Sequence, residues 1–243
     1  MQWKAKPLDP GDVEKFRNSL RTMGVSGTMV HASYLLNMGT SDIALRSKVL
    51  EAFSVEIERA DILGMDLLTF HPGSSTGTTK ENAIRNIAEN LNSVIRDNQH
   101  CTILLENAAG QGSTIGDDFQ QLASIIDGVQ RKDLIGICLD TCHTWAAGYD
   151  IVSPEGYAET MDIFRSVLGL EKLKGIHLND SKKGRGSHVD RHEQIGSGTI
   201  GISGIGNFVM DRNLRNIPMI LETPLGEAGY QQDLNAINSM VGR

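Results

Sequence analysis

Residues 134–140 read L-I-G-I-C-L-D, an apolar run that ends on an acidic residue. The run is continuous rather than alternating in polarity, which is typical of a strand buried on both faces in a parallel sheet covered by helices. Comparable apolar runs recur along the chain, and helical patterns separate them. We expect strands at 25–31, 65–71, 102–106, 134–140, 173–178 and 217–222. The alternation of strand and helix predicts an α/β protein.

Helices are expected around these strands because apolar residues recur there at helical spacing. Their expected ranges are about 10–23, 41–62, 79–97, 117–129, 153–168, 203–211 and 229–240. Asp9-Pro10 should begin the first helix, Ser41 should cap the second, and Ser153-Pro154 should begin the fifth. Because no linker or low-complexity tract divides the chain, we predict a single domain over residues 1–243.

Each expected strand ends, at its carboxyl end, on a residue that can bind a metal ion. These residues are His31, His71, Glu106, Asp140, His177 and Glu222. In a barrel, the carboxyl ends of parallel strands converge on one mouth, whereas an open sheet would spread them along a line. We therefore predict a TIM-type (β/α) barrel.

The same pattern predicts bound metal ions, although any one of these residues alone would more often be a core or turn residue. Burying six carboxylates and imidazoles around one cavity is very unfavourable unless cations compensate. Three more candidates are His143, which follows Asp140, and the loop residues Asp190 and His192. Asp190 and His192 are two apart, so their side chains point the same way in an extended segment. Nine candidates are enough for two or three divalent ions, with zinc the first expectation.

Clustered divalent ions suit the hydrolysis of phosphate esters, because they lower the pKa of bound water and neutralise the phosphate and the leaving oxygen. A sugar isomerase or epimerase with two divalent ions on a related barrel is the main alternative.

A basic cluster consists of Lys182, Lys183, Arg185 and Arg191. It fits a loop that binds phosphates and fits a plain solvated loop equally well. Tyr34 could stack on a base or cover the rim of the barrel.

Composition excludes some classes of protein. The net charge of −7 argues against a general nucleic-acid binder, unless bound cations add positive potential. No apolar run approaches the roughly 18 residues of a membrane span, and no apolar signal core follows Met1. With three cysteines, an odd number, free thiols in a reducing compartment are expected. We expect a cytoplasmic protein without a membrane partner.

Two motifs are poor evidence for the binding sites that their residues suggest. Residues 196–201, G-S-G-T-I-G, match the dinucleotide-binding pattern, but they follow a polar loop rather than a strand, which disfavours that role. Cys138 and Cys142 could suggest a thiolate site, yet Cys138 falls inside an expected strand, where core packing is the more ordinary role. His188 looks like an equal partner of Asp190 and His192 by residue type alone.

With these residues in hand, the chain resembles endonuclease IV, the zinc-dependent apurinic/apyrimidinic endonuclease family. The motifs that carry the resemblance are V-H-A-S-Y-L at 30–35, F-H-P-G-S at 70–74, E-N-A-A-G-Q-G at 106–112, L-D-T-C-H at 139–143, H-L-N-D-S at 177–181, V-D-R-H at 189–192 and I-L-E-T at 220–223. The resemblance implies a (β/α)₈ barrel with three zinc ions, and all nine ligand positions of the family carry the expected residue here.

The resemblance also implies a role for each ligand. The first zinc would be held by His31, His71 and Glu106; the second by Glu106, Asp140, His177 and Glu222; and the third by His143, Asp190 and His192. Glu106, which would bridge two ions, is the expected catalytic residue. Only the resemblance implies that His188 is a bystander. The implied reaction hydrolyses double-stranded DNA 5′ to an abasic site and leaves a 3′-hydroxyl and a 5′-deoxyribose phosphate.

The implied DNA contacts are Tyr34 and Leu35, which would enter the duplex where the abasic sugar is flipped out, with Lys182 and Arg191 on phosphates. One departure from the family pattern lies at the N-terminal end. The first strand, the first helix and the second strand of the family have no counterpart in this sequence. Six of the usual eight strands are therefore expected, with a barrel open beside the strand that carries His31. A monomer is expected, with association through open edges as an alternative. A truncated product that binds zinc or DNA without turnover is a third hypothesis.

Overall fold

The computed structural model describes residues 6–242, so residues 1–5 and 243 of the predicted single domain lie outside the described residues. By its internal contacts the chain divides into two compact units. One comprises Met1–Leu105 and Ser124–Gly136, and the other comprises Glu106–Ala123 and Ile137–Arg243. We call these the first unit and the second unit.

The first unit is built on three parallel strands. They are β1 (Met29–His31), β2 (Leu67–Phe70) and β3 (Thr102–Glu106), whose last residue is counted with the second unit. The strands lie in the order β1-β2-β3, with Met29 beside Leu67 and Leu67 beside Thr102. Every residue of β2 is buried, as expected for a parallel strand with both faces covered.

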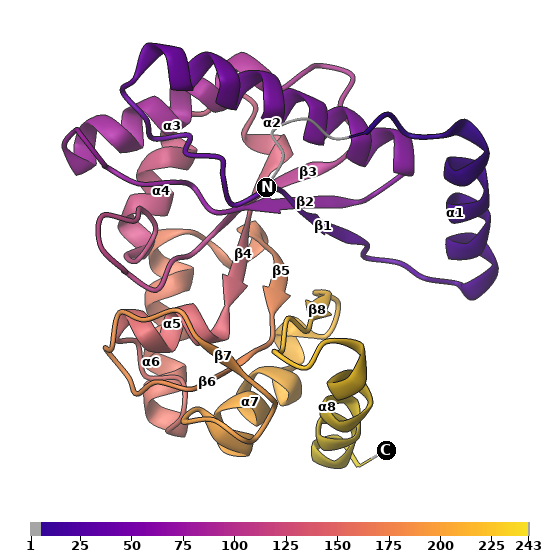
Figure 1. Cartoon of the computed structure of the whole chain (residues 1–243). Helices are drawn as coiled ribbons and strands as arrows, with labels where there is room; N and C mark the ends of the chain where they lie inside the picture. The colour runs from indigo at the N-terminus through magenta and orange to yellow at the C-terminus, as the bar shows by residue number, and fades with distance from the viewer. Residues whose placement is uncertain (1–5, 243) are drawn as a thin grey trace. The chain divides into compact units, whose positions relative to one another are not determined.

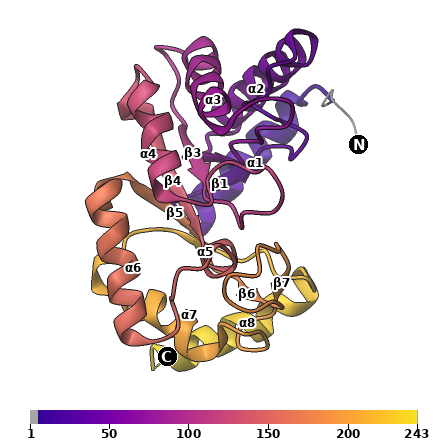
Figure 2. The same ribbon diagram turned by 90° about the vertical axis from the view of Figure 1, so that its left-hand side faces the viewer.

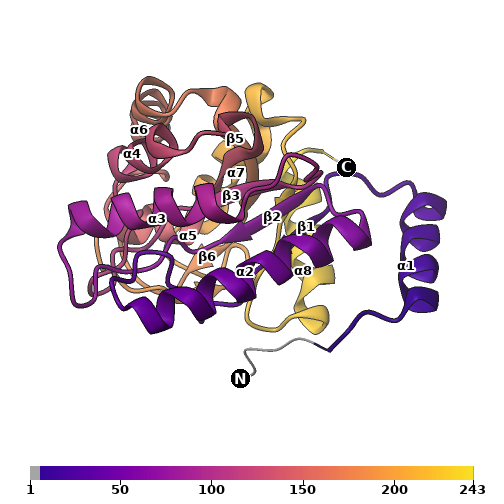
Figure 3. The ribbon, with the colours of Figure 1, turned by 90° about the horizontal axis from the view of Figure 1, so that it is seen from above.

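Helices α2 (Ile43–Leu63) and α3 (Lys80–Val94) lie side by side against these strands (Figure 3). The α2 helix buries Phe53, whose ring centre lies 4.7 Å from that of Phe70 in β2. The predicted cap Ser41 is wrong by one residue, because the Asp42 side chain accepts the N–H of Leu45. Gly64 ends the helix in the left-handed conformation that favours glycine.

The first helix, α1 (Pro10–Met23), begins at the predicted residues, with Asp9 as its cap. Figure 1 shows it standing away from β1 and β2. No residue of α1 is buried, and Met23 is 72% exposed. The helix therefore contributes little to the core of the first unit.

The second unit repeats the strand–helix order. Its parallel strands are β4 (Ile135–Asp140), whose first two residues are counted with the first unit, β5 (Leu173–His177) and β8 (Met219–Ile220). They lie in the order β4-β5-β8. Its helices are α5 (Thr141–Ala147), α6 (Pro154–Val167), α7 (Gly201–Met210) and α8 (Glu227–Met240), and α7 contacts both α6 and α8 (Figure 2). Helix α4 (Phe119–Gly128) begins in the second unit and ends in the first.

Stacked rings fill the core of the second unit. The Phe119 ring stacks on Tyr149 with centres 4.4 Å apart, and it meets the Phe164 ring of α6 edge-on at 5.3 Å. Such aromatic pairs bury a large apolar area in preferred geometries. The cluster thus joins the start of α4 to α6.

Several elements depart from the sequence-based expectation. Helix α5 was not predicted, although Asp140 caps it and Gly148 ends it. Two short antiparallel strands, β6 (Asp180–Ser181) and β7 (His192–Glu193), were also not predicted. The last parallel strand is shorter than residues 217–222, because the Glu222 N–H donates to the Asn179 side chain instead of to a neighbouring strand.

Within residues 6–242 no helix is long and apolar enough to cross a membrane. Short 3₁₀ helices at Lys132–Leu134, Leu170–Lys172 and Arg212–Leu214 precede β4, β5 and β8. They turn the chain from each helix into the next strand.

Candidate metal centre

Four candidate ligands of the second unit come together, each at or just after the carboxyl end of a strand. Glu106 ends β3, Asp140 ends β4, His177 ends β5, and Glu222 follows β8 by two residues. One ligand atom from each lies within 4.8 Å of the others. Parallel strands in register deliver their final side chains to one place, which is the reason for this convergence.

The distances within this group suit a shared cation. The Nδ1 atom of His177 lies 3.0 Å from Glu106 Oε1 and 3.0 Å from Glu222 Oε2. Glu106, Asp140 and His177 are almost completely buried, whereas Glu222 is partly open to solvent. Several carboxylates buried this closely repel one another unless a positive charge compensates.

A second group in the same unit consists of His143, Asp190 and His192, which also offer ligand atoms within 4.8 Å of one another. Asp190 Oδ1 lies 3.3 Å from His143 Nε2 and 3.4 Å from His192 Nε2. Helix α5 supplies His143 in its first turn, and β7 supplies His192. The group adjoins the first one, because His192 Nε2 is 3.5 Å from Asp140 Oδ2.

The hydrogen bonds of the two imidazoles fit metal binding. His143 Nδ1 lies 2.9 Å from the Asn107 carbonyl, and His192 Nδ1 lies 3.1 Å from the Glu222 carbonyl. A carbonyl only accepts, so each Nδ1 donates and each Nε2 keeps its lone pair for a ligand bond, as in metal-binding histidines. Among residues 6–242, the Nε2 atom of His192 is one of few buried side-chain atoms without a hydrogen-bond partner. Imidazole and carboxylate donors of this kind suit zinc.

Two asparagines hold Asp140 in place. Asn179 Nδ2 donates to Asp140 Oδ2 at 2.7 Å, and Asn179 Oδ1 accepts the N–H of Glu222 at 2.8 Å. Asn107 accepts the Asp140 N–H at 2.7 Å. The other oxygen of Asp140 caps α5 by accepting the N–H of His143. Hydrogen bonds of this kind orient metal ligands.

The nearby carboxylates raise the pKa of two buried imidazoles, those of His143 and His177. Burial by itself lowers the pKa of His143, but the nearby carboxylates, led by Asp140, outweigh it and raise the pKa well above its usual range. Burial also lowers the pKa of His177, and Glu106 is the largest of the opposing influences that raise it well above that range. The centre therefore attracts positive charge, which a bound cation would supply.

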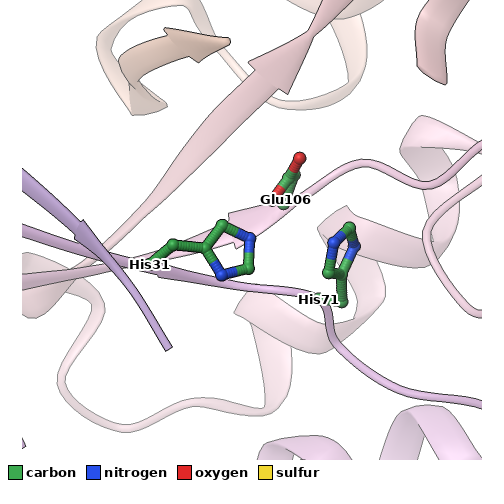
Figure 4. Close-up of side chains that lie close together, drawn as sticks. All are labelled: His31, His71 and Glu106. Atoms are coloured by element: carbon green, nitrogen blue, oxygen red, sulfur yellow. The ribbon is translucent and has the colours of Figure 1, made fainter. Parts of the chain in front are cut away.

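The remaining predicted ligands, His31 and His71, belong to the first unit. His31 ends β1, and His71 follows the last residue of β2. Figure 4 shows both rings in one view, and their centres lie 5.2 Å apart. Glu106, labelled in the same view, is the last residue of β3. That these three residues share one ion stays a prediction.

The predicted DNA contacts lie at the surface. Tyr34 is 66% exposed, in a turn that it shares with the half-buried Leu35. Lys182 and Arg191 are exposed on the segment between β6 and β7. His188, expected to be a bystander, donates its N–H to the Ala146 carbonyl and has a φ of 52°. It is in neither ligand group.

Sequence reasoning missed the residues that support the ligands. Asn107, Asn179 and Asp180 are buried polar residues beside the candidate ligands. Their signal in the sequence was their position one to three residues after the ends of β3 and β5, within the motifs that begin at Glu106 and His177. Core packing is the predicted role of Cys138, which is completely buried. Cys142 is also completely buried, and its sulfur lies within 4.8 Å of ligand atoms of Asp140 and His192.

Comparison with known proteins supports one family. The family described as xylose isomerase-like TIM barrel matches residues 1–240. The chain is 43% identical over 242 residues to the probable endonuclease 4 of Campylobacter concisus, covering 98% of this chain and 85% of that protein. It is 41% identical over 243 residues to the probable endonuclease 4 of Thermoplasma acidophilum, covering 100% and 83%.

A solved structure is also similar. The crystal structure of endonuclease IV from Thermus thermophilus matches with a TM-score of 0.87 and 32% identity, covering 99% of this chain and 85% of that chain. The match confirms the predicted α/β class and the TIM-type fold. Similarity extends over nearly the whole chain in both sequence and structure. The chain therefore belongs to the endonuclease IV family of xylose isomerase-like TIM barrels.

Proposed function

We propose that this chain is a zinc-dependent DNA-repair endonuclease that cleaves double-stranded DNA at abasic sites. It hydrolyses the phosphodiester bond 5′ to the lesion and leaves a 3′-hydroxyl and a 5′-deoxyribose phosphate. The observation that carries the proposal is the pair of adjoining ligand groups in the second unit, in a chain of the endonuclease IV family. Their imidazole and carboxylate donors are those that zinc prefers.

Nine residues hold three zinc ions in this proposal. The sets are His31, His71 and Glu106 for the first ion, Glu106, Asp140, His177 and Glu222 for the second, and His143, Asp190 and His192 for the third. Glu106 is the proposed catalytic residue because it belongs to two sets. When bound, the ions supply Lewis-acid chemistry, lowering the pKa of water and neutralising charge on the phosphate.

The protein's own contribution is to hold these ligands before the substrate arrives. Asn179 fixes Asp140 and the backbone of Glu222 together. The Asn107 carbonyl accepts from His143 Nδ1 and keeps Nε2 directed at Asp190. Because these contacts already exist, little reorganisation is needed when the phosphate binds, which is the basis of electrostatic preorganisation.

Exposed side chains of both units are proposed to bind the DNA. The Tyr34 ring, with Leu35 beside it, is placed in a turn from which it can stack on a base. Lys182 and Arg191 would contact phosphates. Lys182 lies 3.8 Å from its carboxylate neighbour Glu193, and an exposed pair this loose is easily exchanged for a phosphate.

The test is cleavage of a duplex that carries one tetrahydrofuran lesion. A single cut that leaves a 3′-hydroxyl is expected, with an undamaged duplex of the same sequence left intact. Treatment with 1,10-phenanthroline should abolish cleavage and added zinc should restore it, while elemental analysis should give close to three zinc ions per chain. Cleavage that persists after complete metal removal would refute the proposal. Two manganese or magnesium ions per chain would favour the sugar isomerase alternative.

We also propose that residues 1–243 act as one domain and as a monomer. Helix α4 supports the single domain, because one continuous helix belongs to both compact units. A single cooperative transition in urea and the mass of one chain in light scattering are expected. Two separate transitions would contradict the single domain, and twice that mass would contradict the monomer.

A further inference from the structure

Asp180 is a completely buried carboxylate whose partners are backbone N–H groups. Its Oδ1 atom accepts from Ser181 at 2.7 Å and from Ile200 at 2.9 Å. Its Oδ2 atom accepts from Gly196 and Gly198, each at 3.0 Å. The Gly201 N–H lies within 3.2 Å of both oxygens. Successive N–H groups that converge in this way form an anion-binding concavity, filled here by a side chain of the protein itself.

The segment that surrounds Asp180 is the G-S-G-T-I-G motif at residues 196–201. Its contacts with Asp180 and its backbone conformation explain why the motif contains three glycines. A Cβ atom at Gly198 would lie 2.4 Å from Asp180 Oδ1 and 2.4 Å from the Ser181 carbonyl. Only glycine lets the backbone come this close. Gly196 and Gly201 have φ values of 80° and 66°, which also favour glycine.

Asp180 lies at the base of the hairpin that carries the second ligand group. It is the first residue of β6, and β6 pairs with β7, so that Ser181 lies beside His192. The Lys182 N–H also donates to the Arg191 carbonyl at 2.9 Å. The chain is thus held on both sides of His192, by strand pairing before it and by the Asp180 carboxylate from Gly196 onward.

We propose that Asp180 is a positioning residue for the zinc ion held by His143, Asp190 and His192. It acts through the backbone: its carboxylate ties the start of β6 to the segment after β7 and so fixes the hairpin from which Asp190 and His192 project. This role rests on the proposed function in one respect, namely that this ligand group is a zinc site.

A carboxylate is required because both oxygens accept hydrogen bonds. In Asp180→Asn, one oxygen becomes an NH₂ group that faces backbone N–H donors and cannot accept from them. The segment after β7 would then shift, and the ligands on the hairpin would lose their alignment. Loss of residues that orient metal ligands typically lowers metal affinity about 10- to 100-fold. The other zinc ions, held at strand ends, should keep their affinity.

The experiment is a zinc titration of metal-free protein in competition with a chromophoric chelator, with zinc alone as the ligand. Wild-type protein and Asp180→Asn are compared with Asp61→Asn. Asp61 is a matched control in the first unit, because its Oδ1 atom also accepts two backbone N–H groups, those of His100 and Cys101. One zinc equivalent should bind about 10- to 100-fold more weakly in Asp180→Asn, and all equivalents should be unchanged in Asp61→Asn.

Wild-type zinc affinity in a folded Asp180→Asn variant would overturn the proposal and leave Asp180 with a role in stability only. If Asp180→Asn does not fold, Gly198→Ala decides, because it keeps the carboxylate but pushes the segment away from it. Gly198→Ala should weaken the same single equivalent, and unchanged binding would overturn the proposal. Wild-type protein that binds three zinc ions without cleaving the lesion would refute the proposed function alone, since the titration does not depend on cleavage.

Discussion

Removal of the Asn179 side chain should weaken the metal centre without touching a ligand. Asn179→Ala deletes the hydrogen bond to Asp140 Oδ2 and the one from the Glu222 N–H. Both partners remain, but Asp140 can then rotate and Glu222 loses its backbone anchor. The two ligands belong to the same strand-end group, so the same ion should be affected by both losses.

The magnitude follows from the two bonds. A hydrogen bond to a charged group contributes about 1.5–3 kcal/mol and a neutral one about 1 kcal/mol, so the metal-free protein should lose about 2.5–4 kcal/mol of stability. Misaligned ligands should weaken one zinc equivalent about 10- to 100-fold. The stabilisation that excess zinc adds should then fall by a further ~1.4–2.7 kcal/mol, because each tenfold loss of affinity removes about 1.4 kcal/mol.

Asn90→Ala is the matched control. Asn90 is also completely buried, and it also makes one hydrogen bond with a charged group, Arg46, and one with a neutral group, the Met38 carbonyl. Urea unfolding of the metal-free proteins should show similar losses for the two variants. Unfolding in excess zinc should separate them, because only Asn179→Ala loses part of the zinc-dependent stabilisation.

The reasoning would be refuted if both variants gained the same stability from zinc. That result would mean that Asn179 contributes to folding but does not orient Asp140 and Glu222. Chelator competition gives a second measurement, in which Asn90→Ala should bind every zinc equivalent as the wild type does.

Three further predictions concern other parts of the chain. His192→Ala should bind one zinc ion fewer per chain and retain a wild-type far-UV spectrum; unchanged zinc content by elemental analysis would remove His192 from the ligand set. Tyr34→Ala should weaken binding of the lesion duplex by about 1–3 kcal/mol, measured by fluorescence anisotropy in calcium or other conditions without turnover, and unaltered affinity would exclude stacking. Burial, helped by Asp61, raises the pKa of the Cys101 thiol to about 12 from an ordinary 9.0. Its protonated form is therefore favoured in the folded state, and this contribution to stability is complete below pH 9 and is lost as the pH rises toward 12. Urea unfolding between pH 8 and 11 should show a steeper decline for the wild type than for Cys101→Ala, and parallel declines would contradict the prediction.

Much of the secondary structure was predictable because its signals are local. Asp9-Pro10 and Ser153-Pro154 begin helices α1 and α6 where expected, since capping side chains bond to N–H groups only a few residues away. Most of the predicted ends are correct to within two residues. The larger differences are β1, which begins at Met29 rather than at residue 25, and α3, which ends at Val94 rather than at residue 97. Helix α5 was missed because it has only seven residues, too few for a clear apolar period.

The candidate ligands were predictable for a related reason. A parallel strand aligns its carboxyl end with those of its neighbours, so a ligand-type residue at the end of each apolar run predicts convergence without coordinates. In the second unit, Glu106, Asp140, His177 and Glu222 meet in this way. The same argument could not rank loop residues, because a loop has no register that places one side chain relative to another.

The sequence by itself determined the α/β class, the positions of the strand ends and the ligand chemistry found there, because each depends on local periodicity and residue type. Residue type and periodicity alone could not separate the two loop histidines, and only the family resemblance favoured His192 over His188. In the structure His192 lies within 4.8 Å of Asp190 and His143, whereas His188 Nδ1 lies 3.2 Å from the Ala109 carbonyl. The tertiary structure also decided that Asn179 joins Asp140 to the backbone of Glu222 and that the segment 196–201 encloses Asp180. These contacts join residues far apart in the sequence, 43 positions between Asn179 and Glu222 and 79 between His188 and Ala109, and such contacts depend on how the strands and loops pack.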